Sequence, residues 1–215
     1  DNSFNGYNAG LANTTGYSNS FLGSEAGAAN TTGGSNTLIG FQAGNANTTA
    51  SSNTMIGSVS GTANTTGNAN SFLGAGSGLN NISGKQNVFI GANTGQSNTT
   101  GDSSVFVGSR AGSSNNVNGN TFIGHESGIN NTASFQAFLG NRSGFSNSTG
   151  SRNSFLGYES GFSNTSGSNN TFLGFYTGRL NTAANNTFLG SSGGQSNTSG
   201  TENVFTGFES GLSNT

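Results

Sequence analysis

Residues 19–35 read NSFLGSEAGAANTTGGS, and the same pattern recurs along the whole sequence. Its copies are spaced by 17 residues, shortened to 16 in the copies that start at 104, 120 and 170. The thirteen copies begin at Asn2, Asn19, Asn36, Asn53, Asn70, Asn87, Ser104, Asn120, Gln136, Asn153, Asn170, Asn186 and Asn203. The consensus N-[ST]-F-[LI]-G-x-x-[AS]-G-x-x-N-T-T-G-x-x accounts for the whole chain. We therefore expect one repeat domain over residues 1–215, cut from a longer protein.

The composition is polar and almost uncharged. Only 29% of the 215 residues are hydrophobic, 6% are charged, and 38 are Gly. Such polarity is typical of disorder, but the chain has no Pro, a net charge of −2 and strictly periodic apolar residues. The absence of Cys excludes disulfides and thiolate metal sites. The charge balance argues against nucleic-acid binding, and no apolar run is long enough for membrane insertion.

The repeat length predicts an all-β fold, a parallel β-solenoid or β-roll of about 13 coils of 16–17 residues each. Each short apolar run is rich in β-branched and aromatic residues and is closed by Gly, which favours a strand over a helix. Positions five and nine of the repeat are Gly in every copy, and we expect them to form corners with positive φ. Coils spaced by about 4.8 Å would give a rod roughly 60 Å long.

Stacked coils turn each constant position into a ladder. Position three is Phe in eleven copies, with Leu38 and Met55 as exceptions, and position twelve is always Asn. We expect the rings to stack and each Asn amide to donate to the next coil and accept from the previous one. The expected ladder residues include Phe21, Phe72, Phe89, Phe106, Phe122, Phe155, Phe172, Asn13, Asn30, Asn47, Asn64, Asn81, Asn98 and Asn164. N-glycosylation of these Asn residues is the alternative, although the sequon fails at three copies.

Position four is Leu, Ile or Val in eleven copies and adjoins the Phe position. Because neighbouring residues of a strand point to opposite faces, one of the two rows should face outward. Copies of the same row would cover it in a cyclic homo-oligomer. The alternative is a distorted core that holds both rows. The candidate interface residues include Leu22, Ile39, Ile56, Leu73, Ile90, Leu156 and Leu173.

Groups able to perform catalysis are scarce. The single His125 occupies a variable turn position, and no carboxylate pair or Ca²⁺-binding Asp recurs from copy to copy. We therefore predict no enzyme activity, cofactor or metal site. Charges alternate at position seven of four successive copies, Arg110, Glu126, Arg142 and Glu159, which predicts an exterior ion-pair row that fixes the register.

Aromatic side chains outside the Phe row gather at positions six, seven and ten. We consider them a candidate patch for a carbohydrate or protein ligand, with packing between subunits as the favoured alternative. They are Phe145, Tyr158, Phe162, Phe175 and Tyr176.

The motif N-[ST]-F-[LI]-G-x-x-[AS]-G-x-x-N-T-T-G resembles the head repeats of trimeric autotransporter adhesins and the repeats of bacterial and phage tail-fibre proteins. The resemblance covers the whole chain. It implies a homotrimer of left-handed β-rolls, located outside the cell on a bacterial surface or in a phage fibre. It also implies binding to host matrix, cell-surface or carbohydrate ligands. The coil is longer than in that family, and its Asn-Thr-Thr-Gly arm is additional.

Together these features predict a non-enzymatic extracellular structural or adhesive rod. One alternative is a filament subunit that assembles end to end. Another is an ice-binding solenoid that uses a rank of Thr at position thirteen. That rank consists of Thr14, Thr31, Thr48, Thr65, Thr99, Thr132, Thr165, Thr182, Thr198 and Thr215.

Overall fold

The computed structural model describes residues 1–214 and shows a parallel β-solenoid of about twelve turns, with thirteen strands and no helix in that range. The predicted fold class is therefore confirmed. The chain divides into two compact units, residues 1–105 and 106–215, and both are built from the same coil. One residue of the Thr rank named above, Thr215, lies outside the described residues.

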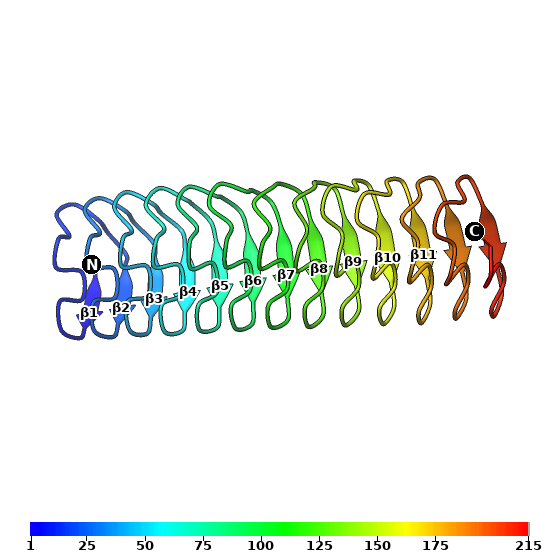
Figure 1. The fold of residues 1–215 in the computed structure, drawn as a ribbon. Helices are drawn as coiled ribbons and strands as arrows, with labels where there is room; N and C mark the ends of the chain where they lie inside the picture. Colours follow the sequence, from blue (N-terminus) through cyan, green and yellow to red (C-terminus); the bar gives the residue numbers. More distant parts are fainter. Residues whose placement is uncertain (215) are drawn as a thin grey trace. The chain divides into compact units, whose positions relative to one another are not determined.

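The first unit stacks its strands in parallel in the order of the sequence (Figure 1). Each strand pairs with the next at equivalent repeat positions, so that Phe21 faces Leu38 and Leu38 faces Met55. The strands are β1 (Ser3–Asn5), β2 (Ser20–Leu22), β3 (Thr37–Ile39), β4 (Thr54–Ile56), β5 (Ser71–Leu73) and β6 (Val88–Ile90).

The second unit follows the same plan. Its strands β8 to β13 pair in parallel and in order, with Phe155 of β10 facing Phe138 of β9 and Phe172 of β11. The strands are β7 (Val105–Val107), which begins at the last residue of the first unit, β8 (Thr121–Ile123), β9 (Ala137–Leu139), β10 (Ser154–Leu156), β11 (Thr171–Leu173), β12 (Thr187–Leu189) and β13 (Val204–Thr206).

The Phe row fills the interior of each unit. Phe72, Phe122 and Phe155 are at most 1% exposed, whereas the strand residues on either side of each are exposed or half-buried. The rings of Phe138 and Phe155 stack with centroids 4.8 Å apart and planes 5° apart. Aromatic stacking adds about 0.5–1.5 kcal/mol per pair to the burial of ring area. The predicted aromatic ladder is therefore the core of the fold.

Small residues opposite the strand let the coil close on this core. Gly27 has φ +57°, and a Cβ placed there would lie 2.6 Å from the Phe21 ring. The preceding residue, Ala26, is fully buried. Any larger side chain at position nine would collide with the ring of its own coil, which accounts for Gly in every copy.

Two more corners of the coil have positive φ, although most copies place a residue other than Gly there. These are positions seven and seventeen, and examples are Val59 (φ 52°), Asn93 (φ 54°) and Phe135 (φ 64°). A side chain with Cβ is disfavoured in this conformation, least so for Asn and most for β-branched or bulky residues. The repeat pattern does not reveal these corners, because stacking of the coils imposes the conformation and Gly does not mark it.

The Asn ladder at position twelve is present, but its polarity is opposite to the predicted one. In the 17-residue coils Nδ2 donates to the Oδ1 of the previous coil, as in Asn30 to Asn13 (2.7 Å) and Asn47 to Asn30 (2.8 Å). The same Nδ2 of Asn47 also donates to the carbonyl oxygen of Ala50 at 3.1 Å. That local bond closes a tight turn and orients the amide towards the preceding coil.

A second amide ladder, which sequence reasoning missed, lies at position one. The Oδ1 of Asn19 accepts the backbone N–H of Asn36 at 2.9 Å, and its Nδ2 donates to the carbonyl of Gly33 at 2.8 Å. Gln136 substitutes for Asn in this role, since its Oε1 accepts the N–H of Asn153 at 3.0 Å. The frequent Asn at the start of the repeat was the signal for this ladder.

The three 16-residue coils interrupt the first amide ladder. In these coils Nδ2 of Asn131 and of Asn181 bonds only to a carbonyl two residues later, instead of three, and no longer reaches the previous coil. Accordingly, Nδ2 of Asn115 and Oδ1 of Asn164 are buried without a hydrogen-bond partner. The predicted ladder is therefore not continuous, because a shorter arm turns the amide away from its neighbour.

Candidate functional site

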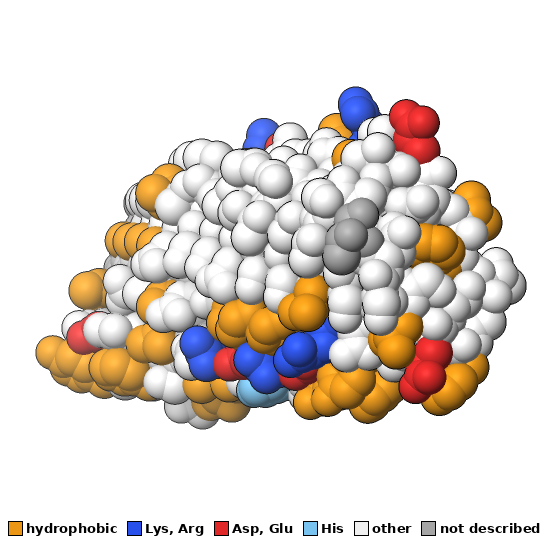
Figure 2. All heavy atoms as spheres, turned by 45° about the vertical axis from the view of Figure 1, so that its right-hand side comes forward, with side chains coloured by type: hydrophobic (Ala, Val, Ile, Leu, Met, Phe, Trp, Pro, Cys, Tyr) orange, Lys and Arg blue, Asp and Glu red, His pale blue; other side chains and the backbone are white. Residues whose placement is uncertain are grey.

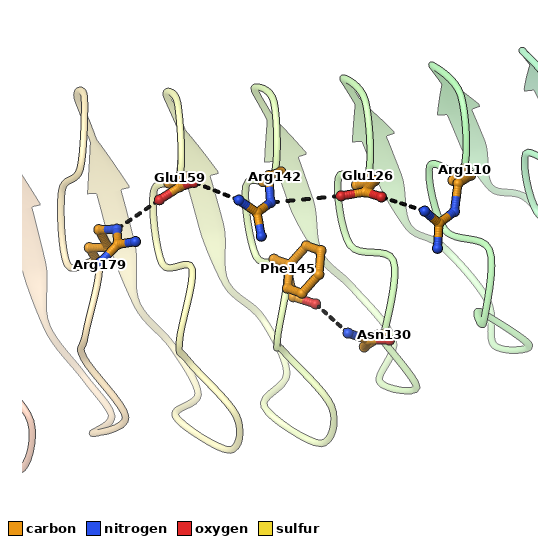
Figure 3. Close-up of polar contacts among 7 residues, drawn as sticks. All are labelled: Arg110, Glu126, Asn130, Arg142, Phe145, Glu159 and Arg179. Carbon is orange, nitrogen blue, oxygen red and sulfur yellow. Dashed lines mark hydrogen bonds and ion pairs between the residues drawn. The ribbon is translucent and has the colours of Figure 1, made fainter.

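A row of alternating charges crosses five successive turns of the second unit (Figure 3). It consists of Arg110, Glu126, Arg142, Glu159 and Arg179, which we call the charge row. The guanidinium of Arg110 lies 2.6 Å from Glu126, and Arg142 lies 3.7 Å from Glu126 and 3.0 Å from Glu159. The four residues predicted from position seven are thus in contact.

The fifth member of the row comes from a different repeat position. Arg179 occupies position ten, and its Nε reaches back to Glu159 at 2.7 Å. Glu159 is only 3% exposed and lies between two guanidinium groups. This carboxylate is therefore a buried centre of the row, not the exterior group expected from the sequence, and Arg179 was missed because no other copy carries Arg at that position.

Aromatic rings pack against the charge row. The guanidinium carbon of Arg142 lies 4.6 Å from the Phe145 ring centroid and 4.7 Å from that of Phe162, and these two rings stack at 4.9 Å. The guanidinium of Arg179 lies 5.2 Å from the rings of Phe162 and Tyr176. Such cation–π contacts contribute about 0.5–1 kcal/mol each at exposed sites.

Three more rings extend this cluster. Tyr158 and Phe175 stack with centroids 5.3 Å apart, and Tyr176 tilts against both, 5.5 Å from Tyr158 and 4.0 Å from Phe175. The negative charge of Glu159, with burial and Tyr176 as further causes, raises the pKa of Tyr158 above its usual 10.0, while Arg142 opposes the shift. The Tyr158 side chain is therefore a neutral phenol over the ordinary pH range.

The structure thus brings together all five aromatic residues of the candidate ligand patch. We call the resulting surface the aromatic–arginine patch. Its members are Arg142, Phe145, Tyr158, Glu159, Phe162, Phe175, Tyr176 and Arg179. Tyr158 and Phe175 are 39% and 50% exposed. Figure 2 shows charged and hydrophobic side chains gathered in one band, beside a surface that is largely neither.

The Leu/Ile row of position four points out of the coil. Leu22 and Leu73 of the first unit are 50% and 47% exposed, and Leu156 and Leu173 of the second are 44% and 39% exposed. The alternative of a core that holds both rows is therefore wrong. The remaining candidates follow the same side of the strands, with Ile90 exposed and Ile39 and Ile56 half-buried.

Shallow apolar grooves run along this outward face. One groove of the second unit is lined by Leu139, Leu156 and Leu173 together with Ala137 and Thr171 of the parallel row at position two. Its first-unit counterpart includes Leu22 and Ile39. Each unit thus has one such groove beside its outward row of position four.

The Thr rank of position thirteen is tied to the coil. The hydroxyls of Thr31, Thr48 and Thr182 each donate to a carbonyl of the next coil at 2.7–3.1 Å. Because these hydroxyls already donate within the protein, they are less available to order water, as an ice-binding surface would require. The sequon residues of position twelve are equally committed, since Asn30 and Asn47 are fully buried.

The remaining titratable groups are scattered. His125 is exposed, as expected for its turn position. Among residues 1–214, no group of three His, Cys, Asp or Glu side chains lies close enough to hold a metal ion. The described part of the chain also has no helix that could span a membrane.

Comparison with known proteins gives no relative. The chain matches no family model, no curated protein and no solved structure. The likeness to trimeric autotransporter heads and tail fibres therefore stays a prediction from the repeat motif. The structure defines the protein as a β-solenoid with amide and aromatic ladders.

Proposed function

We propose that the chain is a non-enzymatic structural module, a stiff repeat scaffold that packs against further copies of itself. Its buried polar side chains support this proposal, because they are used for bonds between coils. Asn36, for example, bonds the N–H of Asn53 at 3.0 Å and the carbonyl of Ala50 at 2.9 Å. Such a construction favours length and rigidity.

The outward Leu/Ile row is the observation that carries the proposed self-association. It places a large apolar side chain on the outward face in eleven of the thirteen copies, and an exposed row of this kind marks an interaction site. A second copy has the same coil spacing, so its outward row would align coil by coil with that of the first. We propose a homo-oligomer for this reason, and the adhesin resemblance favours a trimer.

The finer parts of the proposal are an extracellular location and an adhesive or fibre-forming role. Both rest on the repeat motif and on the low charge of an Asn-, Ser- and Thr-rich surface. A filament subunit remains the second candidate. An ice-binding surface is less favoured, because the Thr31 and Thr48 hydroxyls donate to neighbouring coils.

Mass measurement in solution tests the self-association. We expect the purified chain to have about three times the mass of a single chain, and the double variant Leu156→Lys and Leu173→Lys to be monomeric with an unchanged β-sheet spectrum. The matched control, Thr149→Lys and Ser166→Lys, places the same charges on exposed residues of the arm in two adjacent coils, those that start at 136 and 153. A monomeric wild type, or equal dissociation of both variants, would contradict the proposal.

A further inference from the structure

The aromatic–arginine patch breaks the uniformity of the repeat in three successive coils. The coils that start at 136, 153 and 170 contribute all its members, and those of the first unit hold small, polar or aliphatic residues at most equivalent positions. Five of the twelve charged residues of the protein form the charge row. Such a local departure from a simple repeat indicates that these residues have a function in addition to the stacking of coils.

The arginines of the patch retain unused hydrogen-bond donors. A guanidinium group has five N–H donors. Glu159 accepts from Nη1 of Arg142 at 3.0 Å and from Nε of Arg179 at 2.7 Å. Among the described residues nothing accepts from the two terminal nitrogens of Arg179, whose side chain is 32% exposed. These donors have the planar geometry that binds a carboxylate through two parallel bonds.

The charge of the region favours an anion. The charge row contains three Arg and two Glu, a net charge of +1, whereas the whole chain carries −2. The rest of the protein therefore carries −3, because −2 minus +1 equals −3. An anionic ligand would be attracted to this surface in preference to the remainder of the molecule.

The exposed rings supply an apolar surface beside these donors. The next coil places the small Ser191 where the coil before it has Phe175, so the stack of Tyr158 and Phe175 does not continue. Tyr158 also remains a neutral phenol near Glu159, without adding negative charge to the surface. One face of a sugar ring is lined with C–H groups and can pack against such exposed aromatic side chains.

The size of the exposed surface favours a glycan over a folded protein. A fully exposed aromatic side chain offers about 150–250 Å². Tyr158 and Phe175 expose half of themselves or less, and the two arginines about a third. These four side chains together cannot present the ~800 Å² per partner of a standard protein interface.

We propose that the aromatic–arginine patch binds an acidic polysaccharide, with a sugar carboxylate on the Arg179 guanidinium and a sugar ring against Phe175 and Tyr158. This inference rests on the proposed function, since it gives the adhesive role a class of ligand. It does not depend on self-association, because every member of the patch belongs to one unit of one chain.

Binding to polygalacturonate, a polymer of uronic acids, tests the inference against two other probes. Neutral dextran shares the sugar rings, and polyglutamate shares the carboxylates. We expect polygalacturonate to bind at least tenfold more tightly than either, and added salt to weaken its binding. Equal binding of polyglutamate would show simple charge attraction, equal binding of dextran would show that carboxylates are not recognised, and each result would overturn the proposal.

Variants locate the binding site. Phe175→Ser and Arg179→Gln should each weaken polygalacturonate binding about tenfold or more, whereas Arg152→Gln, which removes an exposed Arg of the same unit outside the patch, should not. Phe175 is half exposed, so its replacement keeps the coil intact even where loss of Arg179 destabilises it. Unchanged binding by Phe175→Ser, or no binding by the wild type, would refute the site. The mass of each sample, measured in parallel, reports separately on self-association.

Discussion

The side-chain Nδ2 of Asn47 donates to Oδ1 of Asn30, 17 residues earlier in the sequence, at 2.8 Å, and both residues are fully buried. In an apolar interior an amide without partners would be destabilising by about 1–3 kcal/mol for each unsatisfied group. The bond therefore links the coils only while the two residues stay in register. This relationship, repeated along the coils, explains how a chain with few apolar residues can fold.

The amide ladder should make large contributions to stability at single positions. Asn47→Ala removes the bonds to Asn30 and Ala50, and it also removes one of the two acceptors of Asn64 Nδ2. We expect the free energy of unfolding to fall by about 2–4 kcal/mol in chemical denaturation. Asn80→Ala, at an exposed position of the next coil but one, should change it by less than about 0.5 kcal/mol. Equal effects would show that the ladder does not stabilise the fold.

The aromatic core should respond to the volume of the side chain. Phe155 stacks on Phe138 and Phe172 at 4.8 Å on each side, and Phe155→Ala should destabilise the protein by about 3–5 kcal/mol. Phe155→Leu should be destabilising by less than about 1.5 kcal/mol, because Leu38 fills the same position in another coil. Thermal unfolding, monitored by circular dichroism, would compare the stability of the two variants. A Leu variant as unstable as the Ala variant would argue against a core that tolerates either side chain.

The turns at position seven predict a stabilising substitution. Val59 has φ 52°, where a β-branched residue is strained by about 1–2 kcal/mol, whereas Asn tolerates this conformation and occupies it at Asn93 (φ 54°). Val59→Asn should raise the free energy of unfolding by about 1 kcal/mol, and the reverse change Asn93→Val should lower it by a similar amount. If the two substitutions change the free energy of unfolding in the same direction, backbone strain is not the cause of the change.

The raised pKa of Tyr158 predicts that the stability of the protein depends on pH in the alkaline range. Its pKa is raised above 10.0, chiefly by the charge of Glu159, so the folded protein keeps a proton that the unfolded chain loses. The associated stability is fully present below pH 10.0 and disappears as the pH rises through the pKa of the folded state.

Phenolate absorbance, taken as the difference between wild type and Tyr158→Phe, would measure this pKa directly. Glu159→Gln should lower the pKa of Tyr158, because it removes the largest cause of the shift. A phenol that titrates at the same pH in both backgrounds would contradict this electrostatic assignment.

The constant positions of the repeat were enough to predict the solenoid, the Phe row and the existence of an Asn ladder. Stacking makes equivalent residues neighbours, so Phe155 and Phe172 could be paired without knowledge of the coil. The charge row followed for the same reason, since Arg142 and Glu159 share a repeat position.

Features that join different repeat positions could not be predicted in this way. The contact of Arg179 with Glu159 links position ten to position seven, and the bond of Asn19 to the Gly33 carbonyl links position one to position fifteen. Both depend on the path of the chain inside one coil. The ladder breaks at Asn131 and Asn181 likewise depend on how a shorter arm turns its amide.

Disulfide trapping measures the register of neighbouring coils most directly, and the natural chain has no Cys to interfere. Ser20 of β2 and Thr37 of β3 are register partners on the outward face, and neighbouring strands lie about 4.8 Å apart, within the Cα range of about 4.4–6.8 Å for a disulfide. The double variant Ser20→Cys and Thr37→Cys should oxidise rapidly within one chain, whereas Ser20→Cys with Thr54→Cys, separated by a further coil, should remain reduced. Equal oxidation of both pairs, or of neither, would contradict the stacked, in-register solenoid.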